Sequence, residues 1–127
     1  MWEHAGLLRN EESLTAGLDA LQRVREKADD LDVGPLTSRS FEYAIDIGFM
    51  LTTAETILQG ARERTESRGA HYRTDHPDTD ETWRRNIRYE QADLGRMTTS
   101  KASVDSPSEA VQDALDEGHE LDYHQLE

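Results

Sequence analysis

The chain has 127 residues, enough for one domain of ordinary size, and its 27 acidic residues against 14 lysines and arginines give a net charge of -13 at pH 7. Because it has no cysteine, disulfides, iron–sulfur ligation and a thiolate nucleophile are excluded. It has no basic stripe for nucleic acid and no apolar run of membrane-spanning or signal-peptide character, so we expect a small, soluble, cytosolic domain without direct membrane insertion or a nucleic-acid partner.

The first predicted helix follows Asn10. An apolar segment over residues 2–8 is typical of one helical turn. Asn10 is then a good N-cap residue, and two glutamates succeed it where the helix dipole favours acidic side chains. Apolar residues recur every three or four positions over residues 14–31, which predicts one amphipathic helix that ends there. Gly34 and Pro35 break the chain after it.

The second predicted helix begins near residues 38–40 and is the central element of the fold. One apolar stripe runs over residues 41–58 and another over residues 43–61. Apolar residues on so wide an arc indicate a helix that is packed from two directions. Arginines lie in its last turn, and Gly69 is expected to take the left-handed conformation of a helix C-cap.

The remaining chain predicts shorter elements. Residues 71–80 show no periodicity and predict an ordered loop, after which Asp80 caps a short turn. The segments 87–89 and 96–98 fit the two strands of a short hairpin. A capping box with proline at the first helical position predicts a third, short helix over residues 107–117.

Motifs that cradle nucleotides or activate a serine are absent from the sequence. No two glycines are separated by a single residue, and neither Gly-Lys-Ser/Thr nor Gly-x-Ser-x-Gly occurs. An enzyme contained entirely in these residues is therefore not expected. Trp2 and Trp83 are each expected to be buried core anchors, because single large aromatic residues beside polar segments usually are.

The densest cluster of polar side chains lies at residues 66–76. Arg68 and Arg73 suit an anion, but we expect them to pair with neighbouring acidic residues and to hold the loop in shape. A metal-dependent hydrolase is an alternative, although the spacing matches no metal-binding loop and no nucleophile is evident for His71 as a general base. A metal site here would enlist His71, Asp75, His76, Asp78 and Asp80, and the hydrolase would use the first three of these residues.

Four segments together resemble the C-terminal domain of succinate dehydrogenase and fumarate reductase flavoprotein subunits, which L-aspartate oxidase also carries in similar form. These segments are residues 1–14, 66–73, 75–77 and 80–83, and the resemblance covers residues 1–89. It implies a mainly α fold, a spectrin-repeat-like three-helix bundle, followed by an acidic, partly ordered extension over residues 90–127. The family's motif positions carry over as candidate interface or loop-shaping residues: Ser67, Arg68, Gly69, His71, Arg73, Asp75 and Trp83.

The resemblance also implies that the chain is a piece of a larger subunit. The intact subunit would oxidise succinate to fumarate and pass electrons through FAD and iron–sulfur centres to quinone. FAD would sit in a separate flavin domain, so no catalytic, cofactor-binding or metal-binding residue is expected here. The expected partners are an iron–sulfur subunit together with the flavin and capping domains of the same polypeptide, in a complex at the cytoplasmic, inner face of the cell membrane.

Two further expectations concern the parent protein and its origin. The combination of His71, Asp75, Pro77 and Trp83 favours succinate dehydrogenase over fumarate reductase and L-aspartate oxidase, and a stand-alone acidic adaptor that binds through the exposed side of the second helix is the alternative from another class. Only two of the basic residues are lysines. A uniformly acidic, lysine-poor surface suits concentrated salt, which screens self-repulsion, so we expect a halophilic rather than a mesophilic origin.

Overall fold

The computed structural model describes residues 1–32, 34–37, 39–91 and 97–116. Its helices are α1 (Glu11–Asp29), α2 (Arg39–Glu63) and α3 (Glu109–Asp116), with the short 3-10 helix η1 (Glu81–Trp83). Its strands are β1 (Leu8–Arg9), β2 (Tyr72–Arg73), β3 (Arg85–Gln91) and β4 (Met97–Ser103). The prediction of a mainly α fold with a hairpin, a short final helix and an irregular C-terminal part is confirmed.

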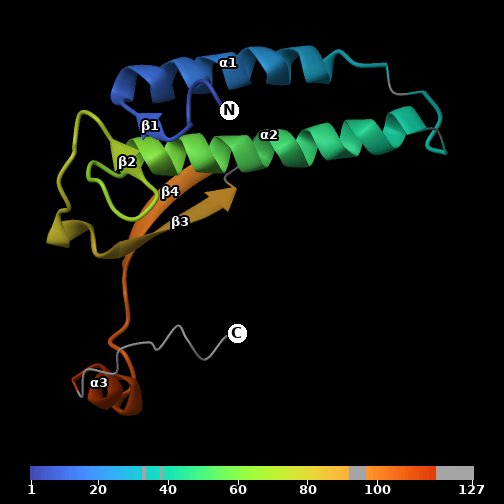
Figure 1. The fold of residues 1–127 in the computed structure, drawn as a ribbon. Coiled ribbons are helices and arrows are strands. Elements are labelled where there is room, and N and C mark those ends of the chain that lie inside the picture. Colours follow the sequence, from blue (N-terminus) through green and yellow to red (C-terminus); the bar gives the residue numbers. More distant parts are fainter. Residues whose placement is uncertain (33, 38, 92–96, 117–127) are drawn as a thin grey trace, which may run out of the picture.

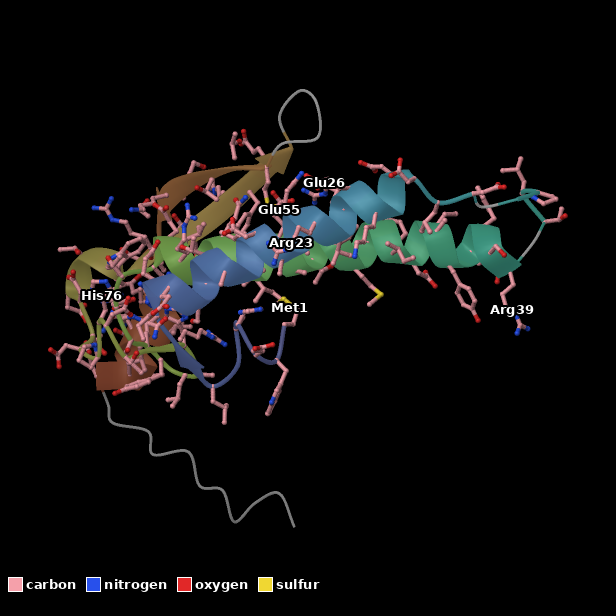
Figure 2. All side chains as sticks on the ribbon, turned by 90° about the horizontal axis from the view of Figure 1, so that it is seen from above. Met1, Arg23, Glu26, Arg39, Glu55 and His76 are labelled. Atoms are coloured by element: carbon pink, nitrogen blue, oxygen red, sulfur yellow. The ribbon has the colours of Figure 1, made fainter. Side chains whose placement is uncertain are left out.

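The helices α1 and α2 lie side by side and antiparallel, and α3 lies apart from them (Figure 1). The described helices therefore form a pair and not the predicted three-helix bundle, because the short α3 buries no residue against the other two. The start of α1 is as predicted, because the Asn10 side chain accepts a hydrogen bond from the Ser13 backbone nitrogen at 2.8 Å and the Asn10 nitrogen donates to the Ser13 hydroxyl. Halfway along the pair, Arg25 and Glu55 join the two helices through an ion pair of 2.7 Å. Figure 2 labels Glu55, which shows where along the two helices this ion pair lies.

A small apolar core joins α1 to α2. Leu14 of α1 and Leu58 and Ala61 of α2 are buried in it. The two helices approach closely at Gly17, where a Cβ atom would lie 2.7 Å from Cδ2 of Leu58 and 2.8 Å from Cβ of His4. Glycine is therefore required at this crossing for the N-terminal segment and α2 to pack against the same turn of α1.

The hairpin of β3 and β4 lies on the other side of α2 from α1 (Figure 1). The strands pair antiparallel, from Arg85 opposite Ser103 to Gln91 opposite Met97. The hydroxyl of Tyr89 reaches Gly60 of α2 so closely that a Cβ atom there would collide with it. The predicted packing of α2 from two directions is confirmed along this C-terminal half of the helix.

The hairpin is longer than predicted, and the third helix begins later than predicted. Both strands are longer than predicted, and the predicted turn, with Arg96, lies outside the described residues. The third helix was predicted over residues 107–117, and it spans Glu109–Asp116 within the described part of the chain.

Three details differ from the sequence predictions. Trp2 is 85% exposed rather than buried, because the turn it belongs to directs Met1 and His4 towards α1 and leaves Trp2 on the solvent side. Leu8–Arg9 form a strand that pairs in parallel with Tyr72–Arg73. Gly69 has the expected positive φ of 58°, but it serves the two-residue turn that joins Arg68 to His71 and does not cap the helix.

Candidate functional site

The loop between α2 and β3 is held by two fully buried charged residues, Glu66 and Arg73. This loop lies at one end of the helix pair, where Figure 2 labels His76, and Arg39 lies at the opposite end. It contains all seven candidate residues of the sequence analysis. The structure brings six of them into one hydrogen-bonded network, and Gly69 forms the turn that links Arg68 to His71.

Arg73 joins the loop to both long helices. Its Nε and Nη2 atoms donate to the two carboxylate oxygens of Asp75, each at 2.7 Å. Its Nη1 donates to the carbonyl oxygens of Ala61 at 3.0 Å and Arg62 at 3.1 Å, which are among the last carbonyls of α2 and lack partners within the helix. Its Nη2 also reaches Oε2 of Glu11 at 3.3 Å. One guanidinium group therefore stabilises the end of α2 and the start of α1 together.

Asp75 completes this half of the network. Its Oδ2 accepts a hydrogen bond from the backbone nitrogen of Glu11 at 2.9 Å, at the positive end of the α1 dipole. The hydrogen bonds from Arg73 hold the pKa of Asp75 well below its usual range. Asp75 therefore remains ionised at every pH at which the protein is expected to work.

Glu66 is the centre of the second half of the network. Arg68 donates to it through Nε at 2.9 Å and through Nη2 at 3.1 Å, and the backbone nitrogen of Asp80 donates at 2.8 Å. Arg64 donates to the same carboxylate and also to the carbonyl oxygen of Trp83. The hydrogen bond from Arg68 is the main reason that the pKa of Glu66 falls to about 2, although burial acts in the opposite direction.

Ser67 is a positioning residue and is not placed as a nucleophile. Its hydroxyl donates to the carbonyl oxygen of His76 at 2.7 Å and accepts from the backbone nitrogen of Arg73 at 2.9 Å. Its backbone nitrogen donates to the carbonyl oxygen of Asp78 at 3.0 Å. Both sides of the loop are thereby tied to Ser67, which fixes the backbone of Arg73.

His71 is half-buried between two arginines. Nη1 of Arg9 lies 2.9 Å from Nδ1 of His71, and because arginine only donates, Nδ1 accepts and Nε2 carries the proton. Nε2 faces the carbonyl oxygen of Arg64 at 3.3 Å. Burial lowers the pKa of His71, and the charges of Arg9, Arg73 and Arg64 lower it further. His71 is therefore neutral, and both of its ring nitrogens already face protein groups.

Trp83 is a buried anchor, as predicted, and it joins the loop to the hairpin. Its indole nitrogen donates to the Thr65 hydroxyl at 3.0 Å. Nζ of Lys101 lies 4.0 Å from the ring centroid, and the Arg64 guanidinium lies 5.3 Å from it. The electron-rich face of an indole ring attracts cations. Because Lys101 belongs to β4 and Arg64 follows α2, Trp83 fixes the position of β4 relative to the end of α2.

The predicted pairing of Arg68 and Arg73 with neighbouring acidic residues is present. Sequence reasoning did not predict that Arg64 belongs to the same network. Arg64 was assigned only to the helix dipole, and nothing local indicated that its side chain would reach Glu66, Trp83 and Arg85. The five candidate metal ligands are spread over separate contacts. Within the described ranges, no three His, Cys, Asp or Glu side chains are placed to share a metal ion.

The chemistry of the network is structural. Each buried side-chain nitrogen and oxygen in the described part of the chain has a hydrogen-bond partner. Buried polar groups that are paired in this way hold their segment of the chain in place. The network can therefore order the loop and fix the surface that the loop presents.

Comparisons with known proteins place similar sequences and folds at the ends of larger proteins. Residues 1–113 match the family model described as fumarate reductase flavoprotein C-term. A fumarate reductase (CoM/CoB) chain of Methanothermobacter marburgensis is 37% identical over 90 residues, which cover 68% of this chain and 16% of that protein. L-aspartate oxidase of Pyrococcus furiosus is 40% identical over 85 residues, which cover 67% of this chain and 14% of that protein.

Solved structures agree with these relatives. A variant of the Escherichia coli quinol fumarate reductase protein FrdA has a TM-score of 0.75 at 25% identity, over 85% of this chain and 20% of that chain. The Mycobacterium smegmatis Sdh1 complex has a TM-score of 0.73 at 28% identity, over 84% of this chain and 19% of that chain. The chain spans about a sixth of the length of the curated relatives that it matches.

Proposed function

Because the chain belongs to the family of fumarate reductase flavoprotein C-terminal domains, we propose that it is the non-catalytic scaffold domain of a succinate dehydrogenase flavoprotein subunit. The observation that carries this proposal is the hydrogen-bonded network of Glu66 and Arg73, which ties the loop to α1 and α2 and in which each buried side-chain nitrogen and oxygen of the described residues is paired. A domain built in this way holds a surface in a fixed shape for the rest of the protein.

In our proposal this chain does not supply the FAD site. It lacks the Gly-x-Gly loop that brings backbone nitrogens to a pyrophosphate, and its buried polar side chains in the described ranges are already paired. In our proposal FAD therefore belongs to the flavin domain of the same polypeptide, and the intact subunit oxidises succinate to fumarate. Fumarate reductase and L-aspartate oxidase are the alternative parents, and both occur among the relatives.

The exposed apolar surface supports a role as one part of a larger assembly. Only four hydrophobic residues are buried in the described structure, whereas large apolar side chains such as Leu7, Phe49 and Met50 are mostly exposed. A monomeric protein rarely leaves so much apolar surface in water. We infer that the flavin and capping domains of the subunit cover part of it and that an iron–sulfur subunit lies nearby.

The proposed setting is the cytoplasmic, inner face of the cell membrane, reached through partner subunits. None of the described helices combines the length and the apolar character needed to cross a bilayer. We also propose a halophilic origin, which the net charge of -13 and the scarcity of lysine support.

The test uses the purified chain and the flavin-loaded fumarate reductase flavoprotein subunit of Haemophilus influenzae, made without the stretch that matches this chain. We expect the chain alone to show no flavin absorbance and no succinate oxidation. We expect it to co-sediment with the flavin-loaded part in analytical ultracentrifugation, followed by flavin absorbance. Succinate oxidation by the chain alone, or independent sedimentation of the two proteins, would contradict the proposal.

A further inference from the structure

An open groove of about 370 Å³ lies beside the network, between the N-terminal segment and the hairpin, with α2 as its floor. We call it the arginine groove. Its main lining side chains are those of Arg9, Ile57, Arg64, His71, Arg85 and Tyr89. Among the residues that the structure describes, no aspartate or glutamate lines it. In a chain with a net charge of -13, this is a locally positive surface.

Two arginines of the groove have no acidic partner. Arg9 and Arg85 form no ion pair with any residue that the structure describes, unlike Arg64, which binds Glu66. Arg9 is nevertheless fixed, because its Nε donates to the carbonyl oxygen of Gly6 at 2.9 Å and its Nη1 donates to His71. Its Nη2 is left without a partner in the described part of the chain.

The groove continues into an exposed apolar strip along α2. Tyr43, Met50, Ile57 and Arg64 follow one another at intervals of seven residues, so they lie on the same side of the helix. Tyr43 is 58% exposed, Met50 69% and Ile57 45%. Ile57 belongs to both surfaces, so the apolar strip leads directly into the arginine groove.

We propose that the arginine groove and the apolar strip form one docking surface for the flavin-binding part of the same protein, through a segment that carries apolar side chains and an aspartate or glutamate. The inference rests on the proposed function and adds to it the face that docks and the chemistry of its partner. A carboxylate in the groove would meet the planar guanidinium groups of Arg9 and Arg85, which suit a two-pronged contact.

The surroundings of the groove favour a protein segment over a free anion. A small anion would fill the groove and leave Met50 and Tyr43 in water, whereas a segment with apolar residues would cover them as well. The low pKa of His71, caused by burial and by the charges of Arg9, Arg73 and Arg64, agrees with a positive potential at this place. Among the side chains of a protein segment, only the carboxylates of aspartate and glutamate carry the negative charge that such a potential attracts.

The test measures the affinity of the full chain for the flavin-loaded part of the H. influenzae flavoprotein subunit described above. Arg85→Glu reverses a charge inside the groove, and Arg88→Glu makes the same change on the opposite face of β3, outside the groove. Met50→Asp changes the strip, and Phe49→Asp changes an equally exposed side chain (69%) a quarter-turn away. Circular dichroism checks that all four variants are folded.

We expect Arg85→Glu and Met50→Asp to raise the dissociation constant at least about tenfold. Both controls should change it less than about twofold. Hydrogen exchange of the wild-type complex should show protection over residues 54–64 and 85–89. If the wild-type chain does not associate at all, the proposed function fails as well. If it associates but the groove and strip variants bind as tightly as their controls, or protection lies elsewhere, only the docking surface is wrong.

Discussion

Arg73 donates to both carboxylate oxygens of Asp75 at 2.7 Å, and this pair connects the end of α2 to the beginning of α1. The connection arises because each residue of the pair also forms a hydrogen bond with one of the helices. The guanidinium also binds the carbonyl of Ala61, and the carboxylate also accepts from the backbone nitrogen of Glu11. The position of the whole loop therefore depends on the fork geometry of one buried side chain.

Replacing Arg73 by lysine tests whether geometry or charge matters. Lysine keeps the charge but cannot form the fork, so at least one helix carbonyl or carboxylate oxygen loses its buried partner. We expect Arg73→Lys to lower the free energy of unfolding by about 2 kcal/mol in urea denaturation. The matched control is the exposed Arg88→Lys, for which we expect a change within about 0.5 kcal/mol. Equal stability of the two variants would show that charge alone is sufficient.

The loss of folding stability at low pH should depend on Glu66. The pKa of Glu66 is lowered from 4.5 to about 2 in the folded protein, so the folded state binds this proton less readily than the unfolded state. Its contribution to stability is therefore complete above pH 4.5 and is lost as the pH falls towards 2. Asp75 has the same sign, because its pKa is also lowered.

The measurement is the free energy of unfolding at a series of pH values, for the wild-type chain and for Glu66→Gln. The variant should be less stable at neutral pH and should lose less stability on acidification. Glu90→Gln is the control, because this side chain is exposed on the hairpin. A variant whose profile runs parallel to that of the wild type would mean that Glu66 does not contribute to acid unfolding.

The protonation of His71 should respond to Arg9. Burial is the first cause of its lowered pKa, and the charge of Arg9 adds to it. Removal of that charge by Arg9→Gln should therefore raise the pKa of His71, as measured by the NMR titration of its imidazole protons. Because the lowered pKa favours the neutral form in the fold, the stability associated with His71 is present above pH 6.5 and declines below it. An unchanged titration in Arg9→Gln would contradict the contact.

Two glycines in the long helices should respond to alanine with opposite signs. At Gly17 a Cβ atom would lie 2.7 Å from Leu58 Cδ2 and 2.8 Å from His4 Cβ, so Gly17→Ala should cost about 1–3 kcal/mol through overpacking. At Gly48 nothing lies within 4 Å of the added atom, so Gly48→Ala should stabilise the chain by up to about 1 kcal/mol through helix propensity. Thermal unfolding of both variants measures the difference, and a stabilised Gly17→Ala would contradict the close approach of the helices.

Salt should stabilise the chain if its origin is halophilic. The net charge of -13 produces self-repulsion in the compact state, which salt screens. We expect the midpoint of thermal unfolding to rise as potassium chloride increases towards molar concentrations. Sodium chloride at the same ionic strength should act in the same way, since screening depends on ionic strength. A midpoint that stays constant or falls with salt would argue against a halophilic origin.

The sequence by itself determined the features whose causes lie within a few residues of one another. Asn10 and Asp80 cap their helices because each accepts from a backbone nitrogen two or three positions later. The apolar stripes of α1 and α2 repeat with the period of the helix that they form. The family motifs likewise depend only on order along the chain, and they identified the family to which the chain belongs.

Tertiary structure alone decided the contacts between segments that are far apart in sequence. No local pattern pairs Leu8–Arg9 with Tyr72–Arg73, brings Arg64 to Trp83, or turns Trp2 towards solvent. These outcomes depend on which surfaces remain open after α1 and α2 have packed. The arginine groove has the same origin, because three separate segments must meet on α2 before Arg9 and Arg85 can line one surface.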